Sequence, residues 1–445
     1  MASEKQYIDL FVQHREMIEK HSSPVLNAPR AEALDSFSAL GFPTKKIEQY
    51  KYTNVDVLFA PDYGLNLNRL HIPVKVQNMF CCDAPELKAS THFVVNDQYF
   101  SPHYDAADFP EGVLFGSLKE MAEIHPELVK KYYAQLAPMT NDALVAFNTM
   151  FAQDGVFFYV PKGVVMEKPL QIINTLRSNV DFIVNRRILI ILEDSAQAKL
   201  LICDHEIDDV RFLSTQVIEV FAGENAVFDL YEMEETSEKT VRFSNLYVKQ
   251  ARGSNVLLNG MTLHNGVSRN QTHVTLDGEG AETHLYGVAI ADKKEHVDNY
   301  TTIRHNAPHC TSNELYKYVL NDEATGAFAG LVYVKEGAQS TASEQTSRAI
   351  CLTKKARMYA QPQLEIYADD VKCSHGSTVG QLDQNAIFYM QQRGISKEEA
   401  KLLLTFAFVN EVTEHVRVDA LKDRLAHIIE RRFRGELSRC KGCTL

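Results

Sequence analysis

Hydrophobic and polar residues follow two different periods along this chain. Between Tyr7 and Ile18 the apolar side chains recur every three or four residues, which is the spacing of one helix face. From about Gly155 short β-branched and aromatic runs alternate with small turns, and after Gly380 the helical spacing returns. The pattern predicts three regions: mostly helical at 1–150, a β core at 151–380 and helical at 381–445.

The turns of the β core return at a nearly constant interval. Measured between turn centres near residues 195, 224, 254 and 280, the steps are 29, 30 and 26 residues. Such a period, with two short strands per repeat, predicts repeats that stack, because one repeat cannot bury its own apolar face. A β-sandwich also has short strands between turns, but nothing in it keeps such a period. The spacing therefore favours a β-solenoid.

The C-terminal region carries two helix-capping signals and one unusually apolar helix. Asp383 is placed to cap a helix that ends at Gly394, and Ser396 with Glu399 forms a capping box for the next helix. That next helix, AKLLLTFAFVNEV, is apolar on nearly every side, so it is either buried all round or meets a partner. The candidate partner-binding residues are Leu402, Leu403, Phe406 and Phe408.

Composition narrows the function classes. The chain has 445 residues, 45% of them hydrophobic and 23% charged, and a formal net charge of −12, which argues against a nucleic-acid partner. No apolar run approaches the ~20 residues of a membrane span, and the charged N-terminus lacks a signal-peptide core. Eight cysteines without an export signal predict reduced thiols and a cytoplasmic location. Neither a phosphate-binding loop nor a GxGxxG motif is present, so we expect no nucleotide site.

The stretch LEIYADDVKCSHGSTVG carries the candidate chemistry. Alternate side chains of a strand point the same way, so Asp369, Cys373 and His375 share one face if the strand is unbroken. A thiolate beside an imidazole suits iron or zinc, and a nearby carboxylate adds a harder ligand or a proton acceptor. The alternative is a buried cysteine beside a hydrogen-bonded histidine. A nucleophilic Cys–His pair fits less well, because no oxyanion-hole element is identifiable.

Two other clusters are interpreted as structural. The acidic run at 204–209 contains a histidine, but a solvated loop between strands explains it. The tail CKGC places Cys440 and Cys443 at the spacing of half a zinc site. Because it lies at a terminus, we interpret it as a flexible tail that binds metal only incidentally.

Four segments of the chain resemble one family. QPQLEIYADDVKCSHGSTVGQLDQNAIFYMQQRGI closely resembles the signature of the SufD branch of the SufB/SufD family, which belongs to the SUF iron–sulfur cluster assembly system. GLVYVKEGAQSTASEQTSRAICLTKKA, FFYVPKGVVMEKPLQI and GFPTKKIEQYKYTNV resemble further segments, although the family often has tryptophan at Tyr50. The CSHG sequence, and the lack of an N-terminal CxxCxxxC run, resemble SufD rather than SufB.

The resemblance implies a fold and a set of partners. It implies a right-handed parallel β-helix between helical regions, in a complex with a SufB-like subunit and a SufC-like ATPase. The ATPase would dock on the C-terminal helices, and a transient iron–sulfur cluster would form near the SufB–SufD interface. His375 is then the strongest candidate for a ligand to that cluster or to iron, and Cys373 is the second. The chain itself would be a scaffold, not an enzyme, and an isolated copy could form a homodimer.

Two rival functions stay open at this point. One is a β-helix polysaccharide lyase or hydrolase, although such proteins are commonly exported. The other is a purely structural adaptor without metal chemistry.

Overall fold

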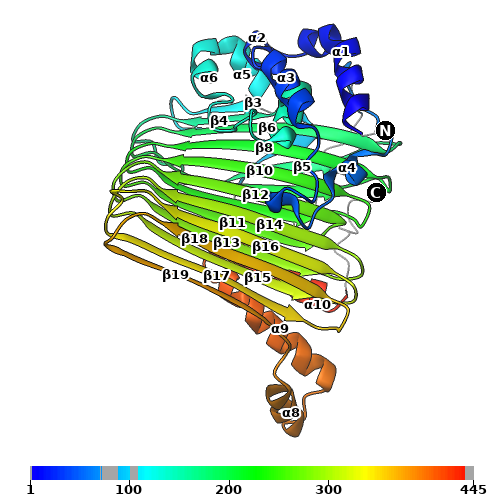
Figure 1. Ribbon diagram of the computed structural model, residues 1–445, viewed down its shortest axis with the longest axis vertical. Coiled ribbons are helices and arrows are strands. Elements are labelled where there is room, and N and C mark those ends of the chain that lie inside the picture. The colour runs from blue at the N-terminus through cyan, green and yellow to red at the C-terminus, as the bar shows by residue number, and fades with distance from the viewer. Residues whose placement is uncertain (1–2, 71, 73–88, 101–108, 436–445) are drawn as a thin grey trace.

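The computed structural model describes residues 3–70, 72, 89–100 and 109–435. It confirms the predicted fold: a parallel β-helix of about eight coils flanked by N-terminal and C-terminal helices (Figure 1). No helix in these described ranges is long and apolar enough to cross a membrane. The CKGC tail with Cys440 and Cys443 lies outside the described residues.

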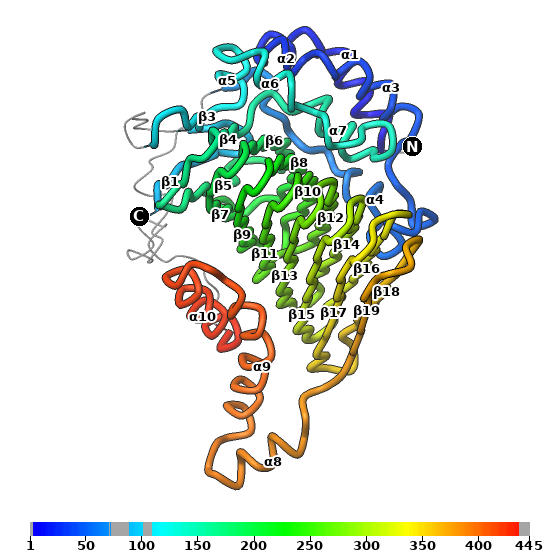
Figure 2. Tube along the Cα trace, turned by 90° about the vertical axis from the view of Figure 1, so that its left-hand side faces the viewer, coloured from blue at the N-terminus to red at the C-terminus, as the bar shows by residue number. Residues whose placement is uncertain are grey.

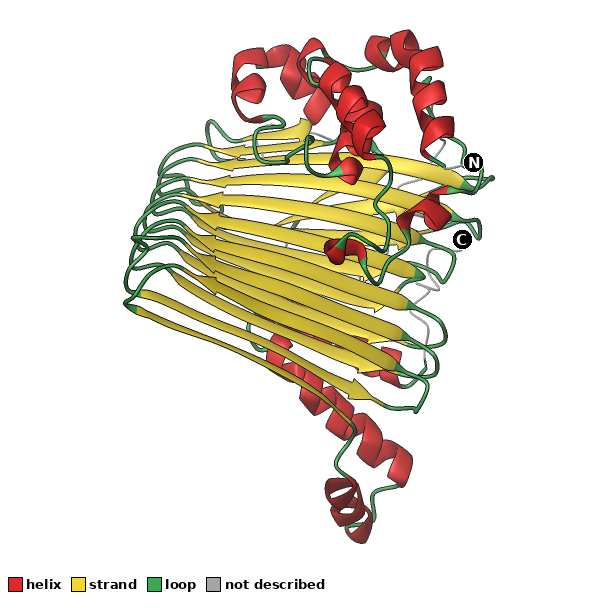
Figure 3. Ribbon diagram, viewed as in Figure 1, coloured by secondary structure: helices red, strands yellow, loops and turns green. Residues whose placement is uncertain are grey.

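The helices lie before and after the long run of strands that begins at Val156, as Figure 3 shows. The first group is α1 Glu4–Lys20, α2 Pro24–Asn27, α3 Arg30–Leu40, the 3-10 helix η1 Glu48–Tyr50, α4 Val55–Phe59, α5 Leu118–Ile124, α6 Pro126–Tyr132 and α7 Ala143–Phe151. The second group is α8 Gln384–Gln392, α9 Lys397–Thr413 and α10 Asp419–Phe433. Asp383 and Ser396 cap α8 and α9 by accepting from the backbone N–H of Asn385 and Glu399, as predicted.

The strands form two sheets. Three strands lie in the N-terminal region: β1 Ser90–Val95, β2 Gln98–Phe100 and β3 Leu114–Ser117. The coils are built from β4 Val156–Val160, β5 Leu170–Leu176, β6 Phe182–Leu192, β7 Gln197–Glu206, β8 Phe212–Ala222, β9 Val227–Glu235, β10 Val241–Gln250, β11 Asn255–His264, β12 Val267–Leu276, β13 Glu282–Ala291, β14 His296–His305, β15 Thr311–Leu320, β16 Thr325–Val334, β17 Thr341–Cys351, β18 Arg357–Ile366 and β19 Val371–Gly380.

Successive strands of the coils alternate between the two sheets. One sheet has the order β19-β17-β15-β13-β11-β9-β7-β5-β1-β2, and the other β18-β16-β14-β12-β10-β8-β6-β4-β3. We call them the odd and the even sheet. The pairings of strands β4–β19 with one another are all parallel, in register over most of the strand length, whereas β3 pairs with β4 antiparallel. A sandwich of antiparallel hairpins is therefore excluded.

The corners of successive coils are joined by a ladder of backbone hydrogen bonds. Six corners that join an even-numbered strand to the next odd-numbered strand contain a residue with a positive φ, in the left-handed region that favours glycine and asparagine. Its N–H donates to a carbonyl of the next corner, for example Ser195 to Glu224 at 2.7 Å and Ser340 to Asp370 at 2.6 Å. These residues are Ser195, Asn225, Gly253, Gly280, His309 and Ser340, and the first four lie within one residue of the predicted turn centres.

Both sheets bury both of their faces along much of their length. Between the sheets lies the lumen, filled mainly with apolar side chains such as Ile190, Ile218 and Phe328. Helix α7 packs on the outer face of the even sheet, and α1 and α3 pack on α7. Helices α9 and α10 cover the outer face of the odd sheet (Figure 2). This coverage explains why strands such as β4 and β5 are mainly apolar and almost fully buried.

A polar column runs through the apolar lumen. Asp204 of β7 lies at its start, paired with Arg186 at 2.6 Å and Arg242 at 2.8 Å, and all three are buried. The prediction of a solvated loop around Asp204 is therefore wrong, because two arginines from the opposite sheet stabilise this carboxylate inside the solenoid. We define the polar column as Asn174, Arg186, Asp204, Gln216, Glu232, Arg242, Ser244, Asn270, Asn299, Glu314 and Gln345.

Candidate functional site

The last coil leaves one end of the solenoid open. In the described part of the chain, β18 hydrogen-bonds only to β16 and β19 only to β17, so each presents a free strand edge. Every residue of β19 is exposed or half-buried. Ile366, Tyr367 and Val379 are exposed apolar side chains at the same end. Free edges with apolar neighbours are a template for pairing with another chain. We call this surface, made by β18, β19 and the turn between them, the open end.

The candidate stretch is not one strand. β18 ends at Ile366 and β19 begins at Val371, with a corner between them. The expectation that Asp369 shares a strand face with Cys373 and His375 is therefore wrong. Asp370 belongs to the corner, where its carbonyl accepts from the Ser340 N–H and its carboxylate accepts from the Ser340 hydroxyl at 2.9 Å. The turn exists because the corner ladder requires one at this point of the repeat.

Cys373 and His375 do lie on the same side of β19, the side that faces the lumen. Cys373 is half-buried against Val332, Val334 and Ala338. Burial raises the pKa of its thiol, although a backbone hydrogen bond from Ser343 opposes the rise. A metal ligand must be the thiolate, so this environment resembles the alternative of a buried structural cysteine. His375 is exposed. The ligand roles of both residues stay predictions.

No group of three or more His, Cys, Asp or Glu side chains in the described ranges is arranged to hold a metal ion. What the open end provides is one exposed imidazole on a strand that can pair with a second chain. Imidazole nitrogen is a borderline ligand that suits iron.

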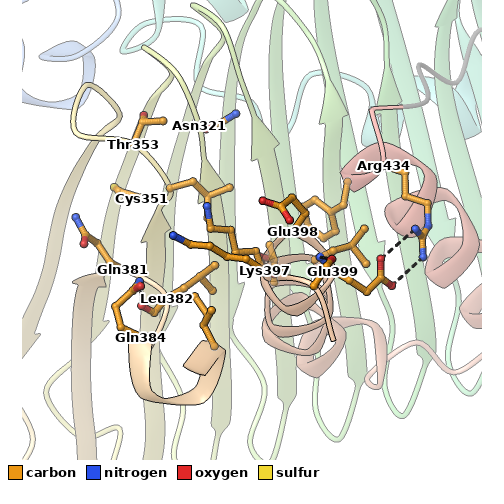
Figure 4. Close-up of a pocket in the computed structure, with 17 residues that line it drawn as sticks. Asn321, Cys351, Thr353, Gln381, Leu382, Gln384, Lys397, Glu398, Glu399 and Arg434 are labelled. Carbon is orange, nitrogen blue, oxygen red and sulfur yellow. Dashed lines mark hydrogen bonds and ion pairs between the residues drawn. The ribbon is translucent and has the colours of Figure 1, made fainter. Parts of the chain in front are cut away.

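The C-terminal helices form a second candidate surface. α8 projects away from the solenoid and packs on α9 (Figure 2). It exposes Phe388 and Tyr389, at 61% and 59%, and α9 exposes Leu403 at 39%. A cleft of about 790 Å³ lies between these helices and the corners of the solenoid. Figure 4 shows Lys397, Glu398 and Glu399 on one side of it and Cys351 and Thr353 on the other; Leu402 also lines it.

The remaining predicted partner residues face this chain itself. Phe406 and Phe408 are partly buried in the cluster that joins α9 and α10 to the odd sheet. The ammonium of Lys317 lies over the Phe408 ring, 4.4 Å from its centroid, and donates to the Phe408 carbonyl at 2.6 Å. Their apolar side chains thus help to dock α9, which the all-round apolar pattern could not distinguish from partner contact.

Arg432 anchors α10 on the same face of the odd sheet. Its guanidinium donates to the Leu263 carbonyl at 2.6 Å, to Asp292 at 2.6 Å and to Glu295 at 3.2 Å. Nearer the start of α10, the rings of Tyr286 and His415 stack with centroids 4.0 Å apart. Sequence reasoning missed these anchors, because their partners are more than a hundred residues away in the chain.

Comparison with known protein families gives a consistent result. Residues 174–408 match the family model described as "SUF system FeS cluster assembly, SufBD core domain", and residues 1–172 match "SufBD protein N-terminal region". The chain is 27% identical to the iron-sulfur cluster assembly protein SufD of Bacillus subtilis over 431 residues, which is 94% of this chain and 96% of that protein.

Two further relatives cover similar lengths. The iron-sulfur cluster assembly protein SufD of Escherichia coli K12 is 26% identical over 420 residues, 92% of this chain and 93% of that protein. An iron-sulfur cluster assembly SufBD family protein of Synechocystis is 26% identical over 423 residues, 93% of this chain and 92% of that protein.

Proposed function

Because the chain belongs to the SufB/SufD family of the SUF iron–sulfur cluster assembly system, we propose that it is the SufD-like scaffold subunit of an assembly complex. In this proposal it pairs with a SufB-like subunit and binds a SufC-like ATPase, which supplies nucleotide hydrolysis. The nascent cluster is the cargo of the complex and forms between the two scaffold subunits. Family membership is the reason to prefer this role over a polysaccharide lyase.

The observation that carries the proposal is the position of His375. It is exposed on the last strand of the solenoid, at a free edge where another chain can add a strand. A partner that pairs with β18 and β19 brings its own side chains next to this imidazole. His375 then contributes one ligand to iron or to the cluster, and the partner contributes others. Without that partner, the same edges are open to a second copy of this chain, which gives a homodimer.

Co-expression with a SufB-like and a SufC-like protein of the same organism tests this role. The complex is purified without oxygen, and its iron, acid-labile sulfide and subunit stoichiometry are measured. His375→Ala should lose iron and sulfide while the stoichiometry stays unchanged. His427→Ala is the matched control, because His427 is an exposed histidine on α10. Normal iron and sulfide in the His375→Ala complex would refute the ligand role and leave a structural adaptor.

We place the ATPase contact on α8 and the exposed side of α9. Phe388, Tyr389 and Leu403 support this choice, since they are apolar, exposed and close to the cleft. Leu403→Glu should reduce the ATPase that co-purifies, because a charge would be buried in the contact. Val12→Glu makes the same kind of change at an exposed apolar residue of α1 and should retain the ATPase. Equal retention by both variants would contradict the assignment.

A further inference from the structure

Three polar side chains stand in line on the lumen side of the odd sheet, at its open end. Glu314 of β15 is the register partner of Gln345 of β17, and Gln345 is the register partner of His375 of β19. Adjacent strands in a sheet lie about 4.8 Å apart, so side chains at paired positions on one face are direct neighbours. The polar column of the lumen thus continues to His375. Glu314 and Gln345 are both 0% exposed.

Within the described part of the chain, the side-chain amide of Gln345 makes a hydrogen bond through its nitrogen but not through its oxygen. Its nitrogen donates to a Glu314 carboxylate oxygen at 2.7 Å, whereas its oxygen has no partner among the described residues. Gly330 of the even sheet lies opposite this amide and leaves space for it, since a Cβ on residue 330 would overlap the amide nitrogen of Gln345. Buried amide oxygens without a hydrogen bond are rare and costly. A donor for this oxygen is therefore expected.

The orientation of the amide follows from Glu314. Burial raises the pKa of the Glu314 carboxyl to about 7, and hydrogen bonds from Thr301 and Gln345 oppose that rise. The amide nitrogen is turned towards Glu314, and above the pKa of that carboxyl the carboxylate is ionised and can only accept, which holds this orientation. The oxygen is left over, and the next lumen-side residue on the other neighbouring strand is His375.

We propose that the side-chain oxygen of Gln345 accepts a hydrogen bond from one ring nitrogen of His375, which fixes the tautomer of the imidazole and leaves the other nitrogen unprotonated for iron. A neutral imidazole has one donor and one acceptor nitrogen, and ligating histidines commonly donate the first to a second residue. Gln345 is then a positioning residue that acts through His375. The part that concerns iron rests on the proposed function, whereas the hydrogen bond itself does not.

Nitrogen NMR of the full-length, metal-free protein tests the hydrogen bond. The protein is labelled with ¹⁵N-histidine and studied at pH 8, and the His375 signals are identified by their loss in His375→Ala. The wild-type protein should show two widely separated ring-nitrogen shifts, as in a single tautomer. In Gln345→Leu the two shifts should converge, because the tautomers then exchange. A wild-type spectrum with averaged shifts would overturn the proposal by itself.

Two further variants separate positioning from simple packing. Ser347→Ala removes another buried polar atom without a partner, at the next lumen-side position of β17, and should leave the His375 shifts unchanged. The double exchange Glu314→Gln with Gln345→Glu keeps a bond between the two residues and restores an acceptor oxygen beside His375. It should restore the single tautomer, and continued averaging in this variant would count against the proposal.

The iron content of the co-expressed complex completes the test. Gln345→Leu should weaken iron retention about 10–100-fold, the usual effect of removing a residue that orients a ligand. If His375 has one fixed tautomer but His375→Ala keeps its iron, the proposed function fails and the hydrogen bond stands. If His375→Ala loses iron but the wild-type tautomers are averaged, the hydrogen bond fails and the proposed function stands.

Discussion

The Arg432 anchor gives a prediction whose size can be worked from its contacts. In Arg432→Met, the apolar part of the side chain keeps much of its volume while the guanidinium is lost. The variant leaves the carboxylate of Glu295, which is fully buried, and that of Asp292 without this cation. It also leaves the Leu263 carbonyl without its donor. Removing one partner of a buried ion pair costs about 3–5 kcal/mol, and we expect about 3 kcal/mol here, because Glu295 keeps its contact with His264 at 2.6 Å and the Asp292 side chain is 26% exposed.

The loss should fall on the docking of α10 rather than on the solenoid, whose sheets are joined by their own backbone ladders. Since about 1.4 kcal/mol changes an equilibrium tenfold, opening of α10 should increase by more than about a hundredfold. Hydrogen–deuterium exchange of the peptide that covers Asp419–Phe433 measures this directly, because exchange reports local opening.

Arg434 on the same helix is the matched control. It is more exposed, and it pairs with Glu430 at 3.0 Å and Glu399 at 3.3 Å. Exposed ion pairs contribute little to stability, so Arg434→Met should change the exchange of α10 only a few-fold. Equal protection in the two variants would show that burial of the Arg432 contacts does not hold the helix in place.

Two further predictions concern the lumen. Gly287→Ala should lower the free energy of unfolding by about 1–3 kcal/mol, because the new Cβ would overlap the Tyr316 ring. Its register partner Gly260 has open space around it, so Gly260→Ala should not lower the stability in this way. Equal urea midpoints for the two variants would contradict this prediction. Burial raises the pKa of Glu314 from 4.5 to about 7, so the folded state holds its proton more tightly and stability falls as pH rises from about 4.5 to about 7. Glu314→Gln should remove up to about 3 kcal/mol of that pH dependence. The measurement compares unfolding midpoints at pH 5 and pH 8, and Glu336→Gln, at an exposed glutamate, is the control. An unchanged pH profile in Glu314→Gln would show that Glu314 does not titrate between these pH values.

The repeat made the solenoid predictable from sequence. Each coil must end in a corner that hydrogen-bonds to the next corner, so turn residues return at a regular interval. The sequence therefore predicted the positions of these turns to within a few residues. The corner at 367–370 was missed because it contains Tyr-Ala-Asp-Asp, without glycine or proline. Counting one more period from Ser340 would have placed it.

The polar column and the docking of the C-terminal helices could not be read in the same way. The sequence pattern around a charged residue such as Asp204 is the same whether its side chain faces the lumen or water. Only its partners from the other sheet, Arg186 and Arg242, show that this carboxylate is buried in the lumen. The caps of α8 and α9 are local, so Asp383 and Ser396 were recognised. The contact of Lys317 with Phe408 joins distant segments, so the residues that face a partner and those that face the sheet look alike in sequence.

The stacking of coils also fixes the length of the molecule. Every coil adds one strand to each sheet, so the number of coils sets the distance from the N-terminal helices to the open end in steps of about 4.8 Å. Deleting one coil between two corners, such as residues 253–279, would shorten that distance by one step and leave the residues of the open end intact. Binding of a partner that contacts only the open end would be unchanged. An assembly whose partners contact both ends of the solenoid would no longer form, because the two contact surfaces would be too close together.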